Sequence, residues 1–148
     1  MNTLPKLKFP AIHLRVRREN DKVFVWDALR RSYLVLTPEE WVRRHVIGFL
    51  TTHCGVEMTA IVQEYPVQLN GTAQRADVVV VDCQAKPLLL VECKAAEVRL
   101  TRAVYEQAMR YNAVVGARYV MLTNGLDTLL YESRTTGYVL LDSMPSLR

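Results

Sequence analysis

Charged side chains at the end of an apolar run are the residues of this sequence that could do chemistry. Residues 75–94 read RADVVVVDCQAKPLLLVECK, with two runs rich in Val and Leu. Such runs predict two strands of a well-buried sheet. Because side chains alternate between the faces of a strand, Glu92 and Lys94 share one face. They need a partner there, since a lone buried charge is costly.

Asp77 is the partner that we expect. It opens the first run, so a hairpin of the two runs brings it to the same end of the sheet as Glu92 and Lys94. Two carboxylates beside an amine could hold a hard divalent cation and orient a water molecule. The plainer alternative is a structural ion-pair network in which Lys94 is held between the two carboxylates. Titration with a metal would distinguish the two.

These residues also resemble a nuclease signature. Asp77 followed by Glu92-Cys93-Lys94 is similar to the D…(D/E)-x-K pattern of restriction-endonuclease-like nucleases. Gln107 and Tyr111 have the spacing of the Q-x-x-x-Y helix motif of RecB-like nucleases in that superfamily. With TPEEWVRR at residues 37–44 and LTNG at residues 122–125, the ordered set resembles the N-terminal nuclease domain of type I restriction enzyme R subunits.

The resemblance implies a site and a fold. Asp77 and Glu92 would bind Mg²⁺ or Mn²⁺, with the backbone carbonyl of Cys93 as a further oxygen ligand. Lys94 would orient or activate the attacking water and offset charge on the phosphate. The implied fold is a three-layer α/β domain of the restriction-endonuclease-like kind, with a mixed β-sheet flanked by helices.

A first helix is predicted from residue 38 to about residue 53. Thr37 is a good N-cap, and Glu40 is placed to close a capping box. At 100° per residue, Glu39 and Arg43 fall inside the apolar stripe, and at a spacing of four they can pair. In the resembled family an acidic residue four before a helix arginine helps to bind metal, which implies that role for Glu39, supported by Arg43. The alternative is that Glu39 only favours the helix dipole.

A second helix is predicted at residues 101–115, with Thr101 as its cap. Gln107 and Tyr111 are adjacent on its apolar face. Taken alone they are typical of a satisfied structural pair. The resemblance instead places Gln107 near the metal or the scissile phosphate, with Tyr111 beside it. Between the strands at residues 88–94 and 118–123, this helix fits a βαβ unit with parallel strands.

The start of the chain predicts β-structure with a basic outer face. Strands are expected at residues 12–17, 22–26 and 33–36, with a loop at 27–32. Arg15, Arg17, Arg30 and Arg31 belong to this region. They are either a solvated face or an edge that contacts nucleic-acid phosphates.

The remaining strands complete one predicted domain over residues 1–148. It consists of an N-terminal β extension (1–36), the core that carries the motifs (37–125) and C-terminal strands (126–148). A long strand is expected at residues 58–69, where Glu64 is a weaker site candidate on the exposed face. Edge strands are expected at residues 129–133 and 138–141.

Composition is that of a globular domain of 148 residues with a net charge of +4, a balance that permits a polyanionic partner. The three cysteines lack zinc-site spacing, so we expect reduced thiols. Neither a signal peptide nor a membrane-length apolar run is visible, so we expect a cytoplasmic protein without a membrane partner.

The function predicted is a Mg²⁺- or Mn²⁺-dependent deoxyribonuclease that acts on DNA. The chain lacks a phosphate-binding G-x-x-x-x-G-K-[ST] loop, so a separate motor or specificity protein is a candidate partner. The alternative is a module of the same fold that binds nucleic acid or protein without cleaving.

Overall fold

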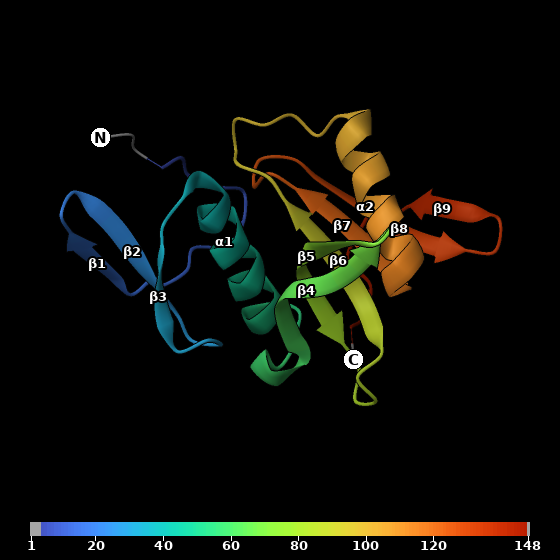
Figure 1. Ribbon diagram of the computed structural model, residues 1–148, viewed down its shortest axis with the longest axis horizontal. Coiled ribbons are helices and arrows are strands. Elements are labelled where there is room, and N and C mark those ends of the chain that lie inside the picture. The colour runs from blue at the N-terminus through green and yellow to red at the C-terminus, as the bar shows by residue number, and fades with distance from the viewer. Residues whose placement is uncertain (1–3, 148) are drawn as a thin grey trace.

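The computed structural model describes residues 4–147, which form two β-sheets and two long helices (Figure 1). The antiparallel N-terminal sheet consists of β1 (Val16–Glu19), β2 (Lys22–Asp27) and β3 (Ser32–Val35). The main sheet has the order β4 (Ile61–Leu69), β5 (Thr72–Val81), β6 (Pro87–Cys93), β7 (Tyr119–Thr123), β8 (Thr128–Arg134) and β9 (Gly137–Leu140). The helices are α1 (Pro38–Thr52) and α2 (Arg102–Val115), and a short 3₁₀ helix, η1 (Met58–Ala60), precedes β4.

The helices cover opposite faces of the main sheet. Val46 and Leu50 of α1 share a core cluster with Val91 of β6, whereas Ala108 of α2 packs in a second cluster with Leu90 of the same strand. Neighbouring residues of β6 therefore point into different clusters, as strand geometry requires. The predicted three-layer α/β architecture is confirmed.

The main sheet is mixed because β6 and β7 run parallel. Their register extends from Leu89 opposite Tyr119 to Cys93 opposite Thr123. The other pairs of neighbouring strands in residues 4–147 are antiparallel. A parallel pair needs a crossover connection, and α2 supplies it, as predicted.

Some predicted boundaries are wrong. Residues 12–15 lie outside the first strand. β5 is one continuous strand, so Asp77 lies within it and not at its start. β8 is an internal strand between β7 and β9, because β9 continues the sheet beyond it.

The segment before β1 is partly buried. Leu7 is buried in the cluster of α1, and the Lys8 N–H donates to the carbonyl of Gly125 at 2.8 Å. The Trp41 indole N–H donates to the carbonyl of Pro5 at 2.8 Å. This segment therefore joins α1 to the turn after β7.

All three cysteines are free, as expected. No helix in residues 4–147 is long and apolar enough to cross a membrane.

Candidate functional site

Asp77 and Glu92 meet across the hairpin of β5 and β6. The register pairs Val78 with Val91, so the next step along both strands brings the two acids opposite each other. The Asp77 N–H donates to Glu92 Oε1 at 3.3 Å, and the Cys93 N–H donates to Asp77 Oδ2 at 2.7 Å. The predicted convergence of the two carboxyl groups is confirmed.

Burial and mutual repulsion disfavour the charged forms of both acids. Burial raises the pKa of Glu92, and the nearby Asp77 carboxylate raises it further. Burial also raises the pKa of Asp77, with the Glu39 carboxylate adding to the rise, while the Cys93 N–H, Arg43 and Lys94 act in the opposite direction. The surrounding cations therefore do not fully offset the two negative charges, so the pair favours binding a proton or another cation.

Lys94 follows directly after β6 at this end of the sheet. Its backbone N–H donates to the Thr123 carbonyl at 2.9 Å, and its side chain is half-buried. The ammonium lowers the pKa of both Asp77 and Glu92, so it lies within electrostatic reach of them. Among the ion pairs of residues 4–147, however, none involves Lys94. An ion-pair network centred on Lys94 is therefore not formed.

The first turn of α1 differs from the prediction. Thr37 is the N-cap, and its hydroxyl accepts from the Glu40 N–H at 3.0 Å. Glu40 is nevertheless buried, and Glu39 is exposed. We expected Glu39 to pair with Arg43, but Arg43 pairs with Glu40. We also expected the Glu40 side chain to return to the cap, but it binds the two arginines instead. Both predictions are wrong. The side of α1 that faces β4 carries Glu40 and Arg44 and not the predicted apolar residues alone, so Glu40 points inwards.

Glu39 still lies near the carboxylate pair, since its charge raises the pKa of both Asp77 and Glu92. A cleft of about 470 Å³ lies between the first turn of α1 and the segment that follows β6. It is lined by Thr37, Pro38, Glu39, Glu40, Arg43, Ala95 and Glu97. A larger cavity of about 780 Å³ lies at the opposite end of β5, beside Asp82, and includes none of the predicted site residues.

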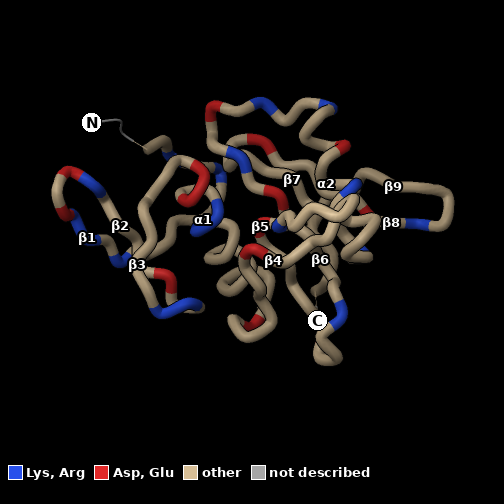
Figure 2. Tube along the Cα trace, viewed as in Figure 1, with Lys and Arg blue, Asp and Glu red and all other residues tan. Residues whose placement is uncertain are grey.

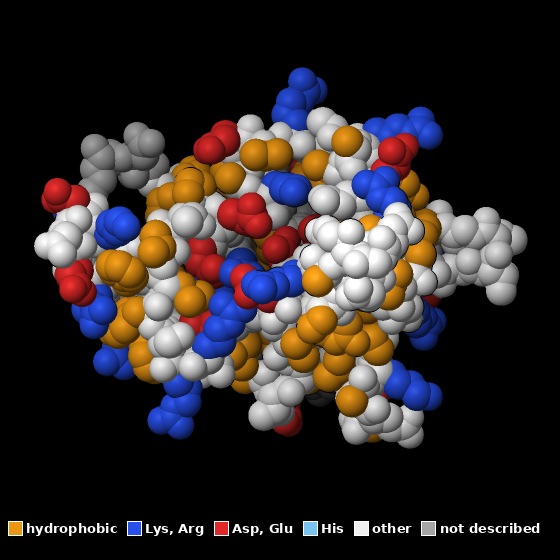
Figure 3. Space-filling view, viewed as in Figure 1, with side chains coloured by type: hydrophobic (Ala, Val, Ile, Leu, Met, Phe, Trp, Pro, Cys, Tyr) orange, Lys and Arg blue, Asp and Glu red, His pale blue; other side chains and the backbone are white. Residues whose placement is uncertain are grey.

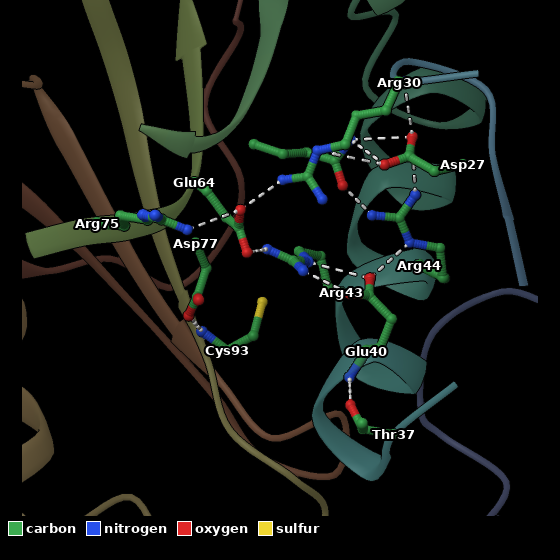
Figure 4. A network of polar contacts seen from close by, with 11 residues as sticks. Asp27, Arg30, Thr37, Glu40, Arg43, Arg44, Glu64, Arg75, Asp77 and Cys93 are labelled. Atoms are coloured by element: carbon green, nitrogen blue, oxygen red, sulfur yellow. Dashed lines mark hydrogen bonds and ion pairs between the residues drawn. The ribbon is translucent and has the colours of Figure 1, made fainter. Parts of the chain in front are cut away.

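Glu40 anchors a buried ion network that the sequence did not predict (Figure 4). It accepts from Arg43 Nε at 3.0 Å and from Arg44 Nε at 2.9 Å. Arg44 continues to Gln63 on β4 and to Asp27 at the end of β2, where the ion-pair distance is 3.4 Å. Asp27 is fully buried. The network thus fixes α1 between the N-terminal sheet and the main sheet.

Glu64 of β4 is the meeting point of three arginines. Its carboxylate lies 2.9 Å from Arg30, 3.4 Å from Arg75 and 3.8 Å from Arg43 (Figure 4). Its φ of 51° is unusual for a non-glycine residue inside a strand. Glu64 therefore pairs with arginines near Asp77. We had predicted only a polar residue on an exposed face, which did not suggest this role.

Gln107 and Tyr111 form the pair that their spacing predicts. Gln107 Nε2 donates to the Tyr111 hydroxyl at 3.4 Å, and that hydroxyl donates to Gln74 of β5 at 3.3 Å. Burial raises the pKa of Tyr111, and Glu92 and Asp77 raise it further, so the hydroxyl lies near the carboxylate pair. Gln74 belongs to no motif, so nothing in the sequence singled it out.

The four N-terminal arginines are divided between two environments. Arg15 and Arg17 lie over aromatic rings of the N-terminal sheet. Arg30 instead pairs with Glu64 and, at 3.7 Å, with Asp27. Arg31 is exposed in the turn between β2 and β3. They do not form a single continuous edge.

Acidic side chains gather in a central hollow of the face shown in Figure 3, with basic side chains beside them. Within residues 4–147 there is no group of three or more His, Cys, Asp and Glu side chains arranged to hold a metal. The candidate site thus offers two opposed carboxylates, with Glu39 at longer range.

Comparisons with known proteins agree with this architecture. No curated protein matches the sequence. A solved structure described as a fragment of a putative HsdR subunit of a type I restriction enzyme from Vibrio vulnificus YJ016 is similar, with a TM-score of 0.57 and 24% sequence identity. The similarity covers 75% of this chain but only 24% of that one, and it shows the fold alone. Residues 38–145 match the model of the family described as type I restriction enzyme R protein N terminus. Since that match spans most of the sequence, this chain belongs to the family of N-terminal domains of type I restriction enzyme R proteins.

Proposed function

We propose that this protein is a metal-dependent deoxyribonuclease domain that hydrolyses phosphodiester bonds. The observation that carries the proposal is the opposed pair of Asp77 and Glu92, whose pKa values are both raised by burial and by neighbouring negative charge. Acids with perturbed pKa values, arranged beside a cleft, are typical of functional sites. Membership of a restriction-enzyme family supports the same reading.

The donor set suits a hard divalent cation. Mg²⁺ is usually held by one or two carboxylates and keeps several waters, so Asp77 and Glu92 suffice as side-chain ligands. The carbonyl of Cys93 would add an oxygen, and Glu39 would complete the shell or hold a second ion. When bound, Mg²⁺ or Mn²⁺ would lower the pKa of a water molecule and polarise a phosphate oxygen.

The other residues of the site would act on the water and the phosphate. Lys94 has no ion-pair partner in the part of the chain described here, so its ammonium is available to orient the water and to offset negative charge on the phosphate. Gln107 would position the water or the phosphate by hydrogen bonds, with Tyr111 holding the amide in place. Arg43 of α1 offsets part of the negative charge of Asp77.

Partners follow from the family. DNA would be the substrate, and the cytoplasm would be the compartment in which a restriction enzyme meets it. A motor or specificity protein would act together with this domain on the DNA, as the family of type I restriction enzyme R proteins implies.

A second candidate is a module that binds nucleic acid without cleaving it. It is favoured by the arginines that lie over aromatic rings on the N-terminal sheet, away from the carboxylate pair.

A cleavage assay distinguishes the two. Linear, circular and single-stranded DNA are incubated with Mg²⁺ or Mn²⁺ and wild type, Lys94→Ala or Lys86→Ala. The control residue lies at the opposite end of β6. We expect Lys94→Ala to lower the rate by about a hundredfold or more, the scale of losing one positioned catalytic group, without weakening DNA binding more than a few fold. Lys86→Ala should cleave like wild type. A wild type that never cleaves would leave the binding module as the better reading.

A further inference from the structure

The N-terminal sheet has two different faces. Val25 and Asp27 of β2 are fully buried, and Asp27 bonds to Gln63 of the main sheet. Trp26 lies between them in sequence and points to the other side of the sheet, as does Phe24. That outer face carries Arg15, Arg17, Phe24, Trp26 and Tyr33, which lie opposite one another in the strand register.

Aromatic rings and guanidinium groups are stacked together on this outer face. Trp26 and Tyr33 pack edge to face with ring centres 5.1 Å apart. The Arg15 guanidinium lies 5.0 Å from the Trp26 ring, and that of Arg17 lies 4.4 Å from the Tyr33 ring. All three aromatic side chains of the face are only half-buried. A solvated arginine face, by contrast, would need no aromatic rings beneath it.

The charge of the chain is concentrated in the same region. Residues 1–36 contain eight Lys and Arg against three Asp and Glu, a net charge of +5, whereas residues 37–148 have a net charge of −1. Of the three acids, Asp27 is buried and faces away from the aromatic side, and Glu19 forms an exposed ion pair with Arg17 at 3.3 Å. Figure 2 shows basic residues along β1, at the start of β2 and in the turn to β3, with acidic residues at the tip of the β1–β2 hairpin. The outer face is therefore complementary to a polyanion.

We propose that the outer face of the N-terminal sheet binds single-stranded DNA. Unpaired bases would stack on Trp26, Tyr33 and the guanidinium planes, while Arg15 and Arg17 neutralise phosphates. A duplex keeps its bases stacked on each other, so it presents phosphates and groove edges but no free base faces to the aromatic rings. Aromatic platforms joined to a basic surface are the usual means of holding single strands without sequence preference.

The face has a direct connection to the carboxylate site. Trp26 is followed by buried Asp27, and the adjoining turn carries Arg30, whose guanidinium lies 2.9 Å from Glu64. Glu64 in turn pairs with Arg43 beside Asp77. A strand bound to the outer face would thus lead over this turn towards the site. This last step alone rests on the proposed nuclease function, whereas the binding itself does not.

Binding is tested without metal, so that cleavage plays no part. Fluorescence anisotropy of labelled oligothymidylate, an abasic oligomer of equal length and charge, and a duplex is measured in the presence of a chelator. We expect oligothymidylate to bind about tenfold or more tighter than the abasic oligomer, because the latter keeps the phosphates but cannot stack. Oligothymidylate should also quench tryptophan emission, and Trp26→Phe should abolish most of this quenching while retaining affinity.

Variants locate the binding to this face. Trp26→Ala and Tyr33→Ala should each weaken oligothymidylate binding several fold or more and leave binding of the abasic oligomer unchanged. Tyr105→Ala is the matched control, since Tyr105 is a half-buried aromatic residue on α2. Equal affinity of wild type for the abasic oligomer and oligothymidylate would overturn the proposal, even if the alanine variants fail to fold. Tight stacking-dependent binding in a protein that never cleaves DNA would retain it and reject only the nuclease.

Discussion

At the scale of single residues, Asp77 and Glu92 are the acids whose charged forms are least favourable in the free protein. Each is buried next to the other, and the charged form of each is disfavoured by burial and by neighbouring carboxylates. Hydrogen bonds from the Asp77 and Cys93 N–H groups offset this only in part. An arrangement that costs stability in the free protein would become favourable if the proposed divalent cation neutralised the pair.

The raised pKa values predict how stability depends on pH. The ordinary values are 3.8 for Asp77 and 4.5 for Glu92, and the folded protein raises them to about 6 and about 8. Between these limits the folded state binds more protons than the unfolded state, so the contribution of the pair to the free energy of unfolding falls as pH rises from about 4 to about 8. Urea unfolding of the metal-free protein across this range measures it.

The variant Asp77→Asn/Glu92→Gln is the control, because other groups also titrate in this range. The difference in stability between wild type and variant should shift in favour of the variant as pH rises. Added Mn²⁺ should stabilise wild type more at high pH than at low pH, since binding requires the deprotonated carboxylates, and should not stabilise the variant. Parallel pH profiles for the two proteins would contradict the proposed coupling.

At the scale of elements, α1 connects the two sheets through its charged face. Glu40, Arg43 and Arg44 have the spacing of residues on one side of a helix, and that side faces Gln63 and Asp27. Arg43 also lowers the pKa of Asp77. The position of α1 therefore determines the charge balance at the carboxylate pair.

Neutralising Glu40 should destabilise the protein far more than neutralising its neighbour. Glu40→Gln removes the carboxylate that two buried arginines share and leaves them only the longer ion pairs with Asp27 and Glu64. A buried pair that loses one partner costs about 3–5 kcal/mol. The exposed Glu39→Gln should change the free energy of unfolding by less than about 0.5 kcal/mol. Glu39→Gln should instead weaken Mn²⁺ binding, measured by calorimetry. If Glu39 proved the more destabilising of the two, the orientation of α1 described above would be incorrect.

The turn after β7 makes a second connection, to the segment before β1. Gly125 has a φ of +86°, and a Cβ there would lie 2.6 Å from Leu7 Cδ2. Gly71 has a similar φ of +76°, but a Cβ there would meet nothing within 4 Å. Gly125→Ala should therefore cost about 1–3 kcal/mol more than Gly71→Ala, the usual scale of overpacking. Urea unfolding measures both, and equal costs would show that Leu7 does not pack against this turn.

At the scale of the whole molecule, the positive charge and the carboxylate pair lie in different parts of the structure. The basic residues are concentrated before α1, whereas Asp77 and Glu92 lie at one end of the main sheet. A DNA strand that reaches the acidic pair would therefore be held mainly by the N-terminal sheet.

Binding of DNA should accordingly depend on salt through the N-terminal arginines. Replacing Arg15, Arg17 and Arg31 by Ser should lower affinity and reduce the slope of log K against log salt concentration by up to about 2–3, since each phosphate contact contributes roughly 0.7–0.9. Arg30 is kept because it pairs with Glu64 and buried Asp27. Ser at Lys86, Arg118 and Arg134 removes the same charge elsewhere and should have little effect. Equal slopes for the two variants would mean that the N-terminal face is merely solvated.

Features that depend on local periodicity and spacing could be predicted from the sequence alone. Alternation along residues 88–94 put Glu92 and Lys94 on one face, and the hairpin with Asp77 followed from two apolar runs with a short connection. The N-cap at Thr37, the helix spacing of Gln107 and Tyr111, and the parallel crossover through α2 were predicted in the same way. Motif resemblance led to the family that the comparisons show.

Which charged groups are buried depends instead on how the elements pack together. Glu39 and Glu40 are adjacent in the first turn of α1, and the apolar stripe favoured the wrong one, because a buried charge follows its partners and not the hydrophobic pattern. Those partners on other elements, Asp27 and Gln63, lie far away in sequence. Pairing between distant segments is set by packing, and no local pattern encodes it.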